Sequence, residues 1–144
     1  MTFAPSYGLI TGLDEFGARS AAIAAARTSF GFDIETGYDG EAREKAALHP
    51  EENFISGISF AGDRTWARYA PLRHVSGVNL DNKQVAELLW PLFHVTDDEG
   101  LPLGVAHGAI FELRVMARWF LRLLWDHPVF GPQVLATRQA AGMV

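Results

Sequence analysis

The sequence predicts a single α/β domain in which helices flank a mixed β-sheet. The first observation is composition: 49% of the 144 residues are apolar and 20% are charged, which is typical of a globular chain with one packed core. The second is periodicity, because short segments of alternating polarity are interspersed with segments whose apolar residues recur at helical spacing. A chain of this size buries roughly 68–70% of its unfolded surface, so we expect one domain over residues 1–144.

The first part of the chain predicts a strand, a helix and a second strand. Residues 1–28 are expected to supply a lead-in strand (7–11) and a helix (14–27), whose AAIAAA run has high intrinsic helix propensity. Segment 29–35 then predicts a strand, because three apolar residues alternate with two acidic ones. An acidic loop is expected over 37–53, where glycine and proline interrupt the pattern.

An antiparallel hairpin is expected after this loop. The loop itself is predicted to hold one helical turn, at 41–48. Two β-rich runs, 54–60 and 65–72, are separated by AGDR. Because Gly62-Asp63 suits a tight turn, the two runs are interpreted as paired strands.

The second half predicts a helix, a short strand and a long helix. Asp81 and Gln84 have the spacing of a capping box, and apolar residues at helical spacing follow until Pro91 ends the run. Segment 101–106 is short, apolar and interrupted by glycine, which suits a buried strand. Segment 109–125 has the strongest helical periodicity in the chain. The element order is therefore that of an α/β domain with a mixed sheet.

Composition also excludes several classes of site. The chain has no cysteine, which rules out disulfides, thiolate nucleophiles and cysteine-based zinc sites and favours a reducing, cytoplasmic setting. The first residues, MTFAPSYGLITG, have neither a basic region nor a long apolar stretch, so neither secretion nor a membrane partner is expected. The net charge of −5 argues against a domain that holds nucleic acid by counterion release alone.

Asp33 and Glu35 are the first candidates for chemistry. They occupy positions i and i+2 of a predicted strand, so both carboxylates leave the same face. Two like charges at this separation oppose each other's ionisation unless a cation lies between them, and Mg²⁺ or Mn²⁺ prefers oxygen ligands of this kind. The alternative is an exposed strand end at which both acids are simply solvated.

The context of these acids resembles a known family. Four stretches resemble, in order, its first motif, its hairpin, its Tyr-x-Pro-x-x-His stretch and its second motif: FGFDIETG, ISGISFAG, WARYAPLRH and GVAHGAIFEL. The family is the 3′–5′ proofreading exonuclease domain, with an Asp-Glu-Asp-Asp active site, of family A, DNA polymerase I-like, DNA polymerases. The similarity covers residues 7–118 and implies a ribonuclease H-like fold.

The resemblance implies an activity and its residues. Asp33, Glu35 and Glu112 take the places of catalytic, metal-binding acids, which implies Mg²⁺ or Mn²⁺ in a two-metal site that hydrolyses terminal phosphodiesters. The implied partner is the 3′ end of single-stranded DNA, together with the remainder of a DNA polymerase or a second copy of the chain. Substrate contacts are implied for four further residues: Thr36, His74, His107 and Phe111. For His74, a turn histidine without contact to substrate is an equally good interpretation.

The sequence departs from the family pattern at several positions. Gly108 and Ile110 replace the usual Asn and Lys of the second motif, and Glu112 is one methylene longer than the usual Asp. Metal geometry is sensitive to such a change, so lower activity is expected. The third motif, with its final Asp, does not occur, because Asp126 is the only acid after Glu112 and has the wrong context.

Two explanations fit this departure. The favoured one is a chain truncated before the third motif, with an incomplete C-terminal part of the fold and residues 126–144 as a tail. The alternative is a non-catalytic module, derived from such an exonuclease, that binds DNA ends or another protein.

Three arginines form a stripe on the predicted long helix. Arg114, Arg118 and Arg122 recur every four residues, which places them on one helix face. Contact with phosphate is one interpretation, but a solvated outer face is the more common use of such a stripe.

Overall fold

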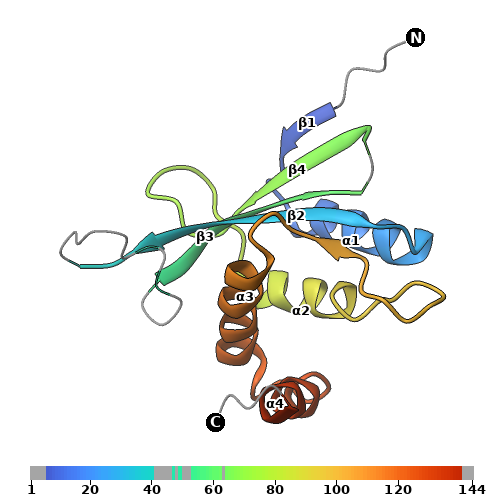
Figure 1. Cartoon of the computed structure of the whole chain (residues 1–144). Coiled ribbons are helices and arrows are strands. Elements are labelled where there is room, and N and C mark those ends of the chain that lie inside the picture. Colours follow the sequence, from blue (N-terminus) through green and yellow to red (C-terminus); the bar gives the residue numbers. More distant parts are fainter. Residues whose placement is uncertain (1–5, 41–46, 48, 50–52, 63, 141–144) are drawn as a thin grey trace.

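The computed structural model describes residues 6–40, 47, 49, 53–62 and 64–140. Within them lie five strands and four helices, which form one mixed sheet and its helical layer (Figure 1). In chain order the elements are β1 (Ser6–Leu9), α1 (Leu13–Ala26), β2 (Phe30–Tyr38), β3 (Asn53–Ala61), β4 (Trp66–Pro71), α2 (Asn82–Leu92), β5 (Gly104–Val105), α3 (Ala109–Leu124) and α4 (Gly131–Ala140).

The strand order across the sheet is β1-β4-β3-β2-β5. β3 runs antiparallel to both of its neighbours, β2 and β4, which confirms the predicted hairpin. The two edge strands are parallel to their partners, β1 to β4 and β5 to β2. β5 pairs only with Phe30 and Gly31, so β5 covers just the beginning of this edge of β2.

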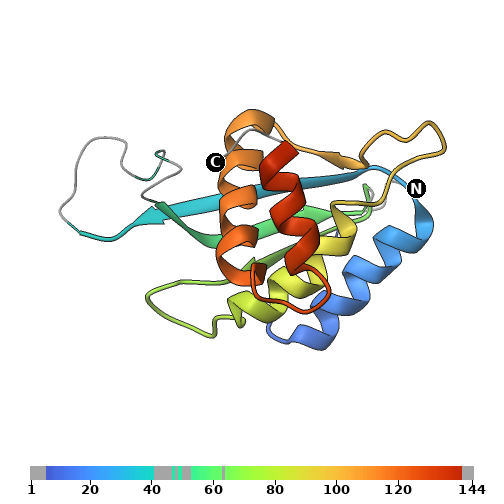
Figure 2. The same ribbon diagram turned by 90° about the horizontal axis from the view of Figure 1, so that it is seen from below.

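The helices gather on one face of the sheet. In Figure 1 the helices lie below the sheet, and Figure 2 shows the same layer from below, with α3 crossing the strands beside α2. Neighbouring helices pack in sequence, α1 against α2, α2 against α3 and α3 against α4. The rings of Phe16 and Phe60, whose centroids lie 5.3 Å apart, join α1 to β3. Burial of such aromatic side chains is the main stabilising term of this layer.

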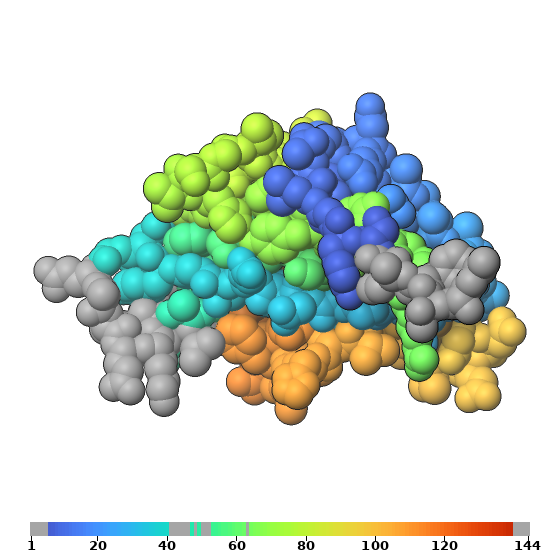
Figure 3. Space-filling model, turned by 90° about the horizontal axis from the view of Figure 1, so that it is seen from above, coloured from blue at the N-terminus to red at the C-terminus, as the bar shows by residue number. Residues whose placement is uncertain are grey.

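The helices of the described ranges leave the other face of the sheet uncovered; it is called the open face here, and Figure 3 views the molecule from that side. Side chains of β2 alternate between the two faces: Phe30, Phe32 and Ile34 are buried, whereas the residues between them are exposed. Opposite β2, β3 places Ser59 and Gly57 on the open face, through the pairs Asp33↔Ser59 and Glu35↔Gly57. The open face is therefore lined by small and polar residues.

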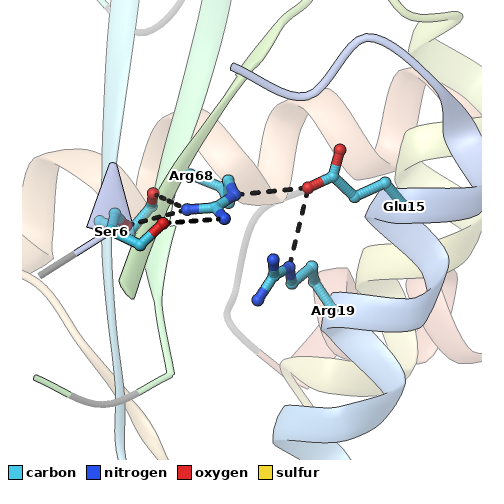
Figure 4. Close-up of polar contacts among 5 residues, drawn as sticks. Ser6, Glu15, Arg19 and Arg68 are labelled. Atoms are coloured by element: carbon cyan, nitrogen blue, oxygen red, sulfur yellow. Dashed lines mark hydrogen bonds and ion pairs between the residues drawn. The ribbon is translucent and has the colours of Figure 1, made fainter. Parts of the chain in front are cut away.

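An ion-pair network ties the first strand to the rest of the fold (Figure 4). Arg68 of β4 donates from Nη1 to the Ser6 carbonyl at 2.9 Å and from Nε to Glu15 Oε1 at 3.3 Å. Glu15 also lies 3.8 Å from Arg19 on the next turn of α1. β1 is thereby held both by its sheet hydrogen bonds and by a guanidinium that reaches α1.

The structure confirms most predicted elements and changes some boundaries. The strand predicted at 29–35 continues to Tyr38, because β3 keeps pairing with it. The Asp81 side chain caps α2 by accepting from Gln84 N at 2.9 Å, and α2 ends at Leu92, one residue after Pro91. Most of the helical turn predicted at 41–48 lies outside the described residues, as does Asp63 of the predicted tight turn.

Two predictions near the C-terminus need correction. Of the strand predicted at 101–106 only β5 forms, since Pro102 instead makes an isolated bridge to Thr96. The Leu103 carbonyl, just before β5, accepts from Phe30 N at 3.0 Å. The segment 126–144, expected to be a tail, contains α4. α4 is held by buried Val134 and by Gln133, whose Oε1 accepts from Trp90 Nε1 at 2.8 Å. No helix in the described part of the chain is long and apolar enough to cross a membrane.

Candidate functional site

Asp33 and Glu35 lie on the open face of β2, as the alternation predicts. Both side chains are exposed, while the apolar residues on either side of Asp33 face the helices. A shallow depression of about 270 Å³ adjoins Asp33 on this face, with Ser59, Ala67 and Val105 among its lining residues. The acids thus leave the sheet where a ligand has access.

Glu112 reaches the same place from α3. Its carboxyl group lies close to that of Asp33, and the side chain is 4% exposed. Burial raises the pKa of Glu112, and the hydrogen bond and negative charge of Asp33 raise it further. A backbone hydrogen bond from Gly108 and the nearby His107 oppose this rise.

The negative charge of Glu112 has little compensation within the described residues. With both groups ionised, Glu112 Oε2 is buried and has no hydrogen-bond partner among the described residues. A neighbouring carboxylate disfavours ionisation of Glu112 unless a positive charge compensates. A hard divalent cation, for which carboxylate oxygens are the preferred ligands, would supply such a charge.

The short β5 explains how Glu112 arrives at Asp33. The chain leaves the sheet after Val105, turns through Gly108 and begins α3 at Ala109. Because β5 pairs with only the first two residues of β2, the first turn of α3 can approach the strand beside Asp33. This turn is also the positive end of the helix dipole, which favours an acidic residue.

Glu35 belongs to a second cluster. The Tyr69 hydroxyl donates to Glu35 Oε2 at 2.8 Å and also lies 2.5 Å from His74 Nε2. Burial and the Glu35 carboxylate both raise the pKa of Tyr69, so the phenol stays protonated and holds this hydrogen bond. The Tyr69 ring crosses over Gly57, where a Cβ would overlap it. Glycine at this position is therefore what lets Tyr69 reach Glu35.

His74 is fixed by a loop contact that the sequence did not reveal. Asn79 Oδ1 accepts from His74 N at 2.7 Å, and Asn79 Nδ2 donates to the His74 carbonyl at 3.0 Å. Strand alternation could have placed Tyr69 beside Glu35, but no sequence signal indicates the role of Asn79 or of Gly57. His74 thus touches a candidate acid through Tyr69, and it is also a turn histidine.

The remaining predicted residues divide between the site and the scaffold. His107 is exposed and lies near enough to Glu112 to lower its pKa. Phe111 is partly buried and packs against the core. The Thr36 hydroxyl donates to the Ala47 carbonyl at 2.7 Å, so it anchors the following loop. Asp126 is ion-paired with Lys83 at 3.4 Å.

The structure therefore arranges the three predicted acids as two groups, the Asp33–Glu112 pair and the Glu35–Tyr69–His74 cluster. Across the described ranges, no set of three histidine or acidic side chains has an arrangement that would hold a metal ion. The donor set nonetheless suits a hard cation at the pair, since carboxylate oxygens are its preferred ligands.

Comparison with known proteins assigns no family to the chain. No protein-family model matches the sequence, and no curated protein matches it either.

Proposed function

We propose that this domain is a 3′–5′ exonuclease-like hydrolase with a ribonuclease H-like fold, acting on the ends of single-stranded DNA. The observation that carries the proposal is the contact between Asp33 and Glu112, which are 79 positions apart and meet beside the open face. The mixed sheet is compatible with this fold, because its three central strands are antiparallel and β5 is parallel to β2.

The residues of the chain have distinct roles in this proposal. Asp33 and Glu112 would hold Mg²⁺ or Mn²⁺, with Glu35 as the further acid on the same face. When bound, such an ion polarises a phosphodiester and makes a water molecule more acidic. Tyr69 keeps Glu35 oriented through its hydrogen bond. His107, beside Glu112, favours ionisation of that acid, which metal binding requires.

A non-catalytic module that binds DNA ends is the second candidate. It is favoured by the engagement of Glu35 with Tyr69 and by the raised pKa of Glu112, which keeps its proton to higher pH than an ordinary carboxyl. Asp126, the last acid of the chain, pairs with Lys83 and does not join the site. In this case the depression beside Asp33 would receive a strand end without cleaving it.

Incubation of the chain with 5′-labelled single-stranded DNA and Mn²⁺ separates the two candidates. The hydrolase predicts a ladder of shortened products that disappears with Asp33→Asn and with Glu112→Gln. Asp14→Asn is the matched control, because Asp14 is an exposed acid in the first turn of α1. Binding without shortening supports the module. Digestion that survives Asp33→Asn, or absence of both binding and digestion, contradicts the proposal.

A further inference from the structure

A cavity on the helix-bearing side of the sheet is lined by three arginines. It has a volume of about 270 Å³ and lies between the beginning of β3, the first turn of α2 and the middle of α3. The arginines are Arg73, Arg118 and Arg122, and among the residues that the structure describes no acidic one lines the cavity. This concentration of positive charge stands out in a chain whose net charge is −5. From it we propose a second anion site, specific for a phosphoryl group.

The three arginines come from two segments and line the same cavity. Arg118 and Arg122 are one helical turn apart on α3, so they project from one face of that helix. Arg73 follows β4; its Nη2 donates to Asp39 Oδ2 at 2.7 Å, and its guanidinium lies 4.1 Å from the centroid of the Phe54 ring. These two contacts fix Arg73 before any ligand binds, which lowers the entropy cost of binding.

Arg122 is the group with the most capacity for a ligand. It makes no hydrogen bond or ion pair with any residue that the structure describes, and its side chain is exposed. Arg114 is exposed as well, as expected for the arginine stripe, but it does not line the cavity.

The other polar side chains of the wall are already engaged. Asn82 Oδ1 accepts from Trp119 Nε1 at 3.1 Å, and Asn82 Nδ2 donates to the Leu72 carbonyl. Buried Asn53 donates to the Ala47 carbonyl at 2.8 Å. These two amide side chains are thus engaged within the protein, and Arg122 is a donor that a ligand can meet.

Phosphate chemistry matches this donor set better than a carboxylate does. A guanidinium presents a planar fork of donors, and one carboxylate is satisfied by one such fork. A phosphoryl group has more acceptor oxygens and a charge close to −2 when terminal, so it can pair with several guanidiniums. The same group occurs as free phosphate, on a mononucleotide and along a nucleic acid strand.

This site is separate from the acids of the open face. The cavity wall includes Ile55 and Val115, which are buried on the helix-bearing side, whereas Asp33 and Glu35 leave the opposite face of the sheet. The proposal therefore does not depend on the exonuclease-like function. It can be tested in EDTA, where no divalent cation can hold a phosphate against Asp33.

The indole N–H of Trp119 is a reporter at the cavity wall. In ¹⁵N-labelled protein with EDTA, we expect inorganic phosphate or deoxythymidine 5′-monophosphate to shift the Trp119 indole signal while that of Trp66, which does not line the cavity, stays in place. A short oligodeoxythymidylate is the third ligand. If only the oligomer shifts the signal, the site takes the internal phosphates of a strand; if the small ligands do so, it takes a terminal or free phosphate.

Arginine variants test whether the phosphate ligands bind in this cavity. Arg122→Ala should weaken binding about tenfold, the loss expected for charge-assisted hydrogen bonds. Arg114→Ala, on the same helix but outside the cavity, should leave binding unchanged. Asp33→Asn should also leave it unchanged, which separates this site from the proposed active site. The proposal is overturned if none of the ligands shifts Trp119, or if Arg114→Ala weakens binding as much as Arg122→Ala.

Discussion

Helices cover one face of the sheet and leave the other bare, although β2 contributes alternate residues to both. On the covered face Phe32 and Phe60 are paired across β2 and β3 and are buried. On the open face the neighbouring pair is Asp33 and Ser59, with Asp33 exposed. The difference teaches that one strand provides both the stability of the fold and its chemistry, separated by the direction of each side chain.

The largest effect expected from this comparison concerns adjacent residues of β3. Phe60→Ala should lower the free energy of unfolding by about 3–5 kcal/mol, because it leaves a cavity among aromatic rings. Ser59→Ala, one residue earlier on the open face, should change it by about 0.5 kcal/mol or less. Urea denaturation of both variants measures the contrast. Equal losses would mean that the two faces do not differ as described.

A smaller effect is expected where the open face is tightly filled. Gly57→Ala should cost about 1–3 kcal/mol, because its Cβ overlaps the Tyr69 ring and forces it away from Glu35. Gly31→Ala is the matched control, since a Cβ at this position of β2 meets nothing within 4 Å. Thermal unfolding of both variants gives the difference.

A double variant identifies the cause of that cost. In a Tyr69→Ala background the ring is gone, so Gly57→Ala should then cost little. If its cost is the same with and without the ring, the Tyr69 overlap is not the reason for glycine at this position.

The smallest expected change in the free energy of unfolding concerns Asp33 and Glu112. Unlike the changes above, it is a gain in stability. Glu112→Gln should raise the free energy of unfolding at neutral pH by about 1 kcal/mol, because the amide can donate to Asp33 without a buried charge. Since the folded state raises the pKa of Glu112, the wild-type chain loses stability as pH rises from the ordinary value of about 4.3 through the folded pKa. The advantage of the variant should therefore vanish at low pH.

Divalent cations provide a second comparison of the wild-type chain with Glu112→Gln. If the pair is a metal site, Mn²⁺ should raise the melting temperature of the wild-type chain and have less effect on Glu112→Gln. Unfolding followed by circular dichroism, as a function of pH and of Mn²⁺, measures both effects. An equal response of the two proteins to Mn²⁺ would mean that Glu112 does not hold the cation.

Much of the scaffold could be predicted from local pattern. The alternation in β2 indicated which residues face the core, and the Asp81 cap marked the beginning of α2. The extent of β5 could not be predicted, because an apolar run does not reveal which of its residues continue the strand pairing. α4 was missed because its sequence has weak amphipathicity and its position depends on contacts such as that of Gln133.

The site was predictable in part. The spacing of Asp33 and Glu35 indicated a shared face, which the structure confirms. The approach of Glu112 to Asp33 was indicated by the family resemblance and not by any local pattern, since tertiary packing brings the two together. The acids form two groups because Tyr69 is hydrogen-bonded to Glu35. The periodicity of a sequence does not predict side-chain contacts of this kind.

The pairing of β2 with β5 has a consequence for the order of folding. The β3–β4 hairpin joins neighbouring segments, whereas β5 meets β2 across more than seventy intervening positions, as in Phe30↔Gly104. Closing so long a loop is entropically costly, and contacts of this kind slow folding. We expect the acid pair to form with these late contacts, so that a partly folded chain would expose its nascent hairpin without yet having assembled the place where Asp33 and Glu112 meet.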